Sequence, residues 1–159
     1  MKQIQRKFVA SGILLEKIPL IGIGKNIEQG YILSQEGVEL RIRRGDHECT
    51  MTVKGKGAMV RDEWTTELPS WVFDTLADKV TGKLLKKVRH SVFCENAQME
   101  IDIFTGVFFG LLILECKFED EESAKMFELP DWAKSAIDVT DDKQYQNREL
   151  ALHPEAITI

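Results

Sequence analysis

The segment Val38–Arg44, which reads VELRIRR, decides the predicted fold because its side chains alternate in character along the chain. Apolar side chains stand at Val38, Leu40 and Ile42, and charged side chains stand between them at Glu39, Arg41 and Arg43. Successive side chains of a β-strand point to opposite faces of its sheet. The segment is therefore predicted to form a strand with one apolar face and one charged face.

The same period of two recurs along the chain and predicts a series of strands. They span residues 2–9, 28–34, 38–44, 48–55, 60–68, 83–93, 98–104 and 112–119. Several are separated by short turn sequences, at 35–37, 45–46, 55–57 and 95–97, and connections this short join antiparallel neighbours. Helical spacing follows Pro69 at 70–80, and it also appears at 120–127 and at 140–152, where Thr140 is a good N-cap.

Most of these strands combine an apolar face with a face that carries charges of both signs. From alternation alone, the simplest interpretation is an open antiparallel sheet with one solvated face. Closure into a barrel would remove the exposed edges, and three modest helices would cover its apolar outside. We therefore predict an α+β, mainly β fold: an eight-stranded antiparallel closed tunnel barrel with a few helices packed outside. Its charged lumen would hold water or an anionic ligand.

Size and composition limit the class of protein. The chain has 159 residues, which fits one domain over 1–159, and a formal net charge of -5, which argues against binding duplex nucleic acid. The odd set Cys49, Cys94 and Cys116 contains no metal-binding pair, which indicates a reduced, cytoplasmic protein. The most apolar run, at 106–115, is too short to cross a bilayer, so we expect no membrane anchoring.

Nine motifs, in the right order, resemble the CYTH domains, also called triphosphate tunnel metalloenzymes. They are QIQRKF (3–8), EQGYIL (28–33), VELRIRR (38–44), TMTVKGKG (50–57), RDEW (61–64), KKVRHS (86–91), MEIDIFTG (99–106), LILECKFEDEESAKMF (112–127) and DVTDDKQYQNRELA (138–151). The resemblance implies an eight-stranded tunnel whose basic side chains bind a triphosphate and whose acidic side chains bind Mg²⁺ or Mn²⁺. Family members include inorganic, thiamine and RNA triphosphatases and class IV adenylate cyclases.

Carried over position by position, the resemblance implies a set of site residues. The substrate-binding set is Lys7, Arg41, Arg43, Lys54, Arg61, Lys87 and Arg89, to which Lys117 is added by its place on the same predicted face. The implied catalytic residues are Lys7, Tyr31, Lys87 and Arg89, and the implied metal ligands are Glu63, Glu100, Asp102 and Glu115. Arginine forks and lysine ammonium groups suit the several negative charges of a triphosphate.

The chain departs from the family pattern where carboxylates are expected. Gln3 and Gln5 replace two glutamates of the first strand, Thr65 replaces another, and Lys117 replaces one near the last strand. Together these changes make the lumen more positive by about five charges. Hard divalent cations prefer charged oxygen ligands, so the expected Mg²⁺ or Mn²⁺ site is weakened.

Three functional classes follow from these features. The first is a divalent-metal-dependent triphosphatase acting on an inorganic or organic triphosphate. The second is a non-catalytic module that binds a triphosphate, nucleotide or polyphosphate without metal, and the two glutamines are also what an engineered substrate trap would carry. The third is an interaction protein that keeps the barrel as a scaffold, which the many lumen cations disfavour. Adenylate cyclase activity ranks below hydrolysis, and the apolar exterior is compatible with a homodimer.

Overall fold

The computed structural model describes residues 4–11, 13, 15–56 and 62–159. Its main element is an antiparallel sheet of nine strands in the order β5-β4-β3-β2-β6-β7-β8-β1-β9. The strands are β1 (Ile4–Val9), β2 (Leu20–Gln35), β3 (Val38–Arg44), β4 (Cys49–Lys54), β5 (Glu63–Leu68), β6 (Thr81–Val92), β7 (Gln98–Thr105), β8 (Leu112–Phe118) and β9 (Ile137–Asp138). The α-helices are α1 (Ser70–Ala77), α2 (Glu121–Met126) and α3 (Asn147–Leu152). Single 3₁₀ turns lie at η1 (Leu15–Lys17), η2 (Gly106–Phe108), η3 (Asp131–Ala133), η4 (Lys143–Tyr145) and η5 (Pro154–Ala156).

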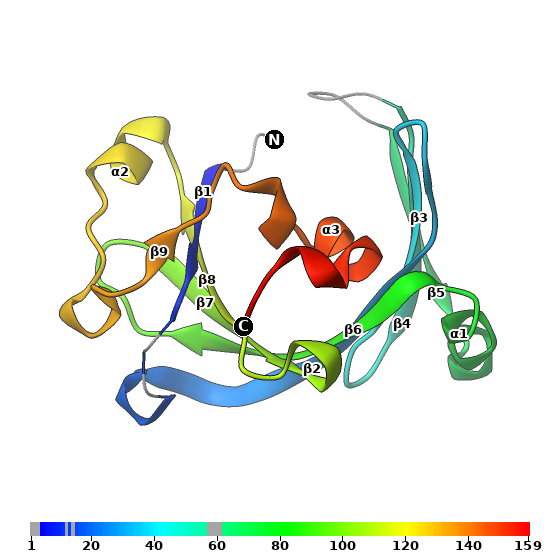
Figure 1. The fold of residues 1–159 in the computed structure, drawn as a ribbon, viewed down its shortest axis with the longest axis horizontal. Coiled ribbons are helices and arrows are strands. Elements are labelled where there is room, and N and C mark those ends of the chain that lie inside the picture. Colours follow the sequence, from blue (N-terminus) through cyan, green and yellow to red (C-terminus); the bar gives the residue numbers. More distant parts are fainter. Residues whose placement is uncertain (1–3, 12, 14, 57–61) are drawn as a thin grey trace.

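The prediction of a closed barrel of eight strands is wrong, because the sheet has two ends and a ninth strand. Strand β1 pairs with β8 on one side and with the short β9 on the other, so β5 and β9 are the two edges. The sheet instead curls into a trough, with β1 and β8 on one wall and β3, β4 and β5 on the other (Figure 1). A closed barrel of the first eight strands would require β1 to pair with β5, but β1 pairs with β9 on that side.

Strand β2 is longer than its predicted span of 28–34, since it begins at Leu20. Its pairing with β6 shifts register between Ile21 and Lys25, and its pairing with β3 shifts between Tyr31 and Leu33. Such irregularities break strict alternation, which is why the period of two did not reveal the first half of the strand.

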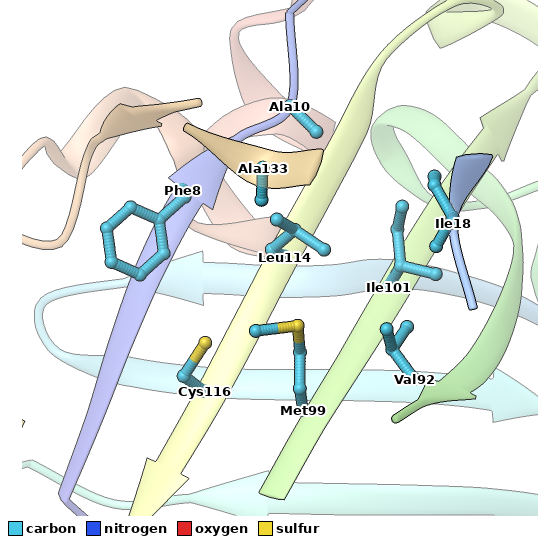
Figure 2. Packing of buried hydrophobic residues seen from close by; sticks show 9 residues of the cluster. All are labelled: Phe8, Ala10, Ile18, Val92, Met99, Ile101, Leu114, Cys116 and Ala133. Atoms are coloured by element: carbon cyan, nitrogen blue, oxygen red, sulfur yellow. The ribbon is translucent and has the colours of Figure 1, made fainter. Parts of the chain in front are cut away.

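Two apolar clusters cover the convex side of the sheet. One packs the β7, β8 and β1 side chains against the segment that carries α2 and η3, and includes Met99, Leu114 and Ala133 (Figure 2). The other packs α1, through the fully buried Phe73, against Ile42 of β3 and Cys49 of β4. These helices form where they were predicted, and α2 begins after Asp120, whose side chain accepts a hydrogen bond from the Ser123 amide at 2.6 Å.

The third predicted helix, at 140–152, differs in both form and place. It is divided into η4 and α3, and the Thr140 hydroxyl accepts a hydrogen bond from the Lys7 amide of β1 at 3.1 Å instead of capping a helix. Helix α3 lies inside the curve of the sheet and not outside it (Figure 1). Its Leu150 and Ala151 pack in a buried cluster with Leu85 and Phe104, against which Tyr145 of η4 also packs. We call η4 and α3 together the plug, because they fill one end of the trough with apolar side chains. The opposite end keeps charged side chains.

The fit of α3 against β6 depends on Gly82, which has a φ of +74°. A Cβ at this position would overlap the carbonyl oxygen of Ala151 and lie 3.0 Å from Leu152 Cα. We expect Gly82→Ala to lower the free energy of unfolding by about 2–4 kcal/mol, through backbone strain and displacement of α3. Thermal denaturation followed by circular dichroism measures this loss.

Gly22→Ala is the matched control, because Gly22 has a similar φ of +68° but a Cβ added there would meet no other atom within 4 Å. This substitution should lower the free energy of unfolding by only about 1 kcal/mol, the cost of placing alanine in a left-handed backbone conformation. Equal losses in the two variants would contradict the described packing of α3 on β6.

Candidate functional site

The charged face of the sheet lies on the inside of the curve, and we call it the concave face. A cavity of about 960 Å³ lies there. Its basic lining comes from three strands, with Lys25 of β2, Arg41 and Arg43 of β3 and Arg89 of β6. The acidic Asp46, Glu48, Glu67 and Glu100 and the threonines Thr50, Thr52 and Thr65 complete the lining. The alternation in VELRIRR thus directs Arg41 and Arg43 into the cavity and Ile42 toward Phe73 of α1.

Arg41 and Arg43 are cations that lack a direct ion pair in the part of the chain that the structure describes, although the charges of Asp102 and Glu48 act on Arg43 from nearby. Neither makes an ion pair there, and the Arg41 Nε atom is buried without a hydrogen-bond partner. Burial, together with the neighbouring guanidinium groups of Arg89 and Arg41, lowers the pKa of Arg43. Burying like charges side by side is costly unless an anion compensates them. The pair therefore forms a site suited to a multiply charged anion.

A buried ion network lies next to this pair. The Asp102 carboxylate accepts hydrogen bonds from Lys87 Nζ at 2.7 Å and from Arg89 Nε at 2.7 Å. Burial alone would raise the pKa of Asp102, but the hydrogen bonds and charges of Arg89 and Lys87 hold it below its ordinary value. Burial, with the nearby Arg89 charge, lowers the pKa of Lys87. Asp102 therefore keeps both cations in place.

The Glu100 and Glu115 carboxylates extend the network toward β1. These residues are directly opposite one another in the β7–β8 pairing, and both contact Arg89, at 3.3 and 3.5 Å. Lys7 Nζ lies 3.8 Å from Glu115, and Lys117 Nζ lies 3.5 Å from Glu100. Each of the two carboxylates is thus shared between two cations of the protein.

The residues of this face do not fit the divalent metal site that the resemblance implies. Both Asp102 oxygens are taken by Lys87 and Arg89. Glu63 lies on β5, whereas Glu100 and Glu115 lie on the other wall of the trough (Figure 1). Within residues 4–11, 13, 15–56 and 62–159, no group of three or more His, Cys, Asp or Glu side chains is placed to hold a metal ion. Three of the four implied ligands, Glu100, Asp102 and Glu115, are instead paired with lysine and arginine side chains.

The remaining predicted residues lie in several different places. Lys54 pairs in register with Glu63, and Thr65 hydrogen-bonds Thr52 at 2.9 Å, all on the wall formed by β4 and β5. Tyr31 is buried beside the plug, where its hydroxyl accepts a hydrogen bond from Gln29 Nε2 at 3.1 Å. Gln5 is exposed on β1, opposite Lys117. The predictions for Gln3 and Arg61 lie outside the described residues.

The structure also brings in residues that the sequence interpretation omitted. Lys25 of β2 lines the cavity, and it was missed because the predicted strand began at Glu28. Alternation continued backward from Tyr31 would have placed it on the same face. The plug also contacts the site, since Lys87 Nζ donates to Asn147 Oδ1 and Lys7 Nζ donates to the Tyr145 carbonyl, both at 3.2 Å. Nothing in the local pattern of residues 140–152 indicates these contacts.

Comparison with known proteins places the chain among phosphohydrolases. No protein-family model matches it. The inorganic triphosphatase of Nitrosomonas europaea is 32% identical over 157 residues, covering 96% of this chain and 98% of that protein. The inorganic triphosphatase of Acetivibrio thermocellus is 30% identical, with 96% and 95% of the two chains covered.

A solved structure extends the likeness from sequence to fold. The crystal structure of the inorganic triphosphatase NE1496 superposes with a TM-score of 0.76 at 28% identity, covering 96% of this chain and 95% of that one. Among the described residues, none of the helices is long and apolar enough to cross a membrane. With similarity along nearly its whole length, the chain belongs to the family of the inorganic triphosphatases, whose tunnel fold its motifs resemble.

Proposed function

We propose that this protein binds a triphosphate on its concave face and hydrolyses it as an inorganic triphosphatase. The observation that supports this most directly is the pair Arg41 and Arg43, which face a cavity of about 960 Å³ and make no direct ion pair among the described residues. The relatives named inorganic triphosphatase make triphosphate the first ligand to consider.

The chemistry of the face suits this ligand. The guanidinium groups of Arg41 and Arg43 can each donate a fork of hydrogen bonds to phosphate oxygens, and the hydroxyls of Thr50 and Thr52 line the same cavity. Hydrolysis adds a water oxygen to the terminal phosphorus and breaks the bridging P–O bond, which releases orthophosphate and diphosphate. Lysine and arginine side chains that contact the bound triphosphate would stabilise the negative charge that develops on the departing diphosphate.

A second function, binding without turnover, is supported by the first strand. At the family's paired glutamates this chain has Gln3 and Gln5, and an amide can neither bind a hard cation strongly nor accept a proton from water. The carboxylates Glu100, Asp102 and Glu115 are held by protein cations. A protein of this kind would sequester or sense a triphosphate.

One experiment separates these functions and tests their common basis. Sodium tripolyphosphate is titrated into the protein by calorimetry, and orthophosphate release is measured on the same samples, with diphosphate as the shorter control ligand. We expect tripolyphosphate to bind more tightly than diphosphate, since a longer anion reaches more of the cations. Release of orthophosphate supports the hydrolase, and binding without release supports the binding module. If tripolyphosphate does not bind, the proposed site is wrong.

A further inference from the structure

Lys117 is a partly paired cation beside the cavity, which it reaches through its contact with the cavity-lining Glu100. Its ammonium group lies 3.5 Å from Glu100 Oε2, and its side chain is 27% exposed. It donates no hydrogen bond within the described residues, and the residues opposite it on both neighbouring strands, Gln5 and Gln98, are neutral. An ammonium group has three N–H donors, so most of its capacity is free for a ligand.

The carboxylate that Lys117 approaches is itself unusual. Glu100 Oε2 is buried and accepts no hydrogen bond from the described residues, while Arg89 Nη1 lies 3.3 Å away and Lys117 Nζ lies 3.5 Å away. A buried carboxylate oxygen requires a positive charge close by. Two protein cations supply that charge, and they would repel a divalent cation that approached the same oxygen.

We propose that Lys117 takes the place of a divalent cation on this face, so that the protein binds triphosphate without a metal ion. This inference rests on the proposed function. The ammonium group neutralises Glu100 on one side and donates to phosphate oxygens on the other, which are the two tasks of a metal that bridges a carboxylate and a phosphate. Lys117 is thus a ligand-binding residue, and its ammonium group removes the need for a metal ion in triphosphate binding.

The test measures tripolyphosphate binding by calorimetry in EDTA and, separately, in MgCl₂. For the native chain we expect affinities in the two buffers within about threefold of each other, because the site supplies its own cation. Lys117→Met keeps the length of the side chain and removes its charge, and it should weaken binding in EDTA by about tenfold or more. The exposed Lys79, in the turn after α1, provides the control variant Lys79→Met, which should bind like the native chain.

A second measurement uses the metal alone. Lys117→Glu adds a carboxylate beside Glu100, so this variant should bind Mn²⁺ in the absence of phosphate, as measured by electron paramagnetic resonance, and should bind tripolyphosphate only when metal is present. The native chain and Lys79→Glu should bind no Mn²⁺ in the same assay. Thermal denaturation verifies that each variant is folded. If Lys117→Glu does not fold, the comparison of Lys117→Met with the native chain in EDTA still tests the inference.

The outcomes separate this inference from the proposed function. If the native chain binds tripolyphosphate only with Mg²⁺, the metal replacement is refuted while the triphosphate site stands. If Lys117→Met binds as tightly as the native chain in EDTA, Lys117 has no such role. If the native chain binds tripolyphosphate in neither buffer, the proposed function itself is wrong, and the inference falls with it.

Discussion

Asp102→Asn is expected to lower the free energy of unfolding by about 3–5 kcal/mol, the usual cost of removing one partner from a buried ion pair. The carboxylate accepts hydrogen bonds from Lys87 and Arg89 at 2.7 to 2.9 Å, and the Lys87 side chain is only 1% exposed. Asparagine keeps the shape but leaves the Lys87 ammonium uncompensated inside the protein. The melting temperature should fall by roughly 6–20 °C for a domain of this size.

Two further variants make this expectation specific. Asp74→Asn breaks an exposed ion pair with Arg44, formed at 2.6 Å, and should cost no more than about 1 kcal/mol. The double variant Lys87→Met with Asp102→Asn should recover much of the loss, because the methionine places apolar atoms near the Phe104 ring, which Lys87 Nζ already approaches to 5.4 Å. A loss at Asp102 no larger than that at Asp74 would contradict the buried network.

The same network sets the acid limit of stability. The pKa of Asp102 is lower in the folded protein than in the unfolded chain, where a carboxyl titrates near about 4. Its contribution is therefore complete above that unfolded value and is lost as the pH falls through the lower folded value. Urea denaturation between pH 7 and pH 2 should show a steeper acid decline for the native chain than for Asp102→Asn.

Arg43→Leu is expected to weaken tripolyphosphate binding by about 10- to 100-fold, which corresponds to losing hydrogen bonds to a charged group. Arg41→Leu should have an effect of the same size. The free protein should be as stable as before or more stable, because burial and the adjacent Arg89 and Arg41 disfavour the charge at Arg43. Calorimetric titration and thermal denaturation of the same samples measure the two quantities.

The adjacent Arg44 provides a control with the opposite signature. Its side chain lies on the convex face, where it contacts Glu28 at 3.1 Å and lies over the Phe73 ring at 4.5 Å. Arg44→Leu should lower the melting temperature and leave tripolyphosphate affinity within about twofold, since it removes structural contacts and no ligand contact. Equal effects of Arg43→Leu and Arg44→Leu on affinity would show that general charge, and not the cavity, governs binding.

Much of the site was predictable because the faces of a strand follow from local sequence. Alternation in VELRIRR correctly assigned Arg41 and Arg43 to one face and Ile42 to the other, and the same rule grouped Lys87 with Arg89 and Glu100 with Asp102. Where the predicted strand was too short, as in β2, residues of the same face were left out, and Lys25 was missed.

The sequence by itself determined most of the strands, their antiparallel turns and which of their side chains share a face, because these properties depend on residues a few positions apart. Only the tertiary structure decided that the sheet stays open, that α3 lies within its curve and that Lys117 meets Glu100. Those outcomes depend on contacts between distant segments, such as β1 with β9 and Lys87 with Asn147. Such contacts are fixed by packing, burial and charge compensation across the whole chain, and no local period encodes them.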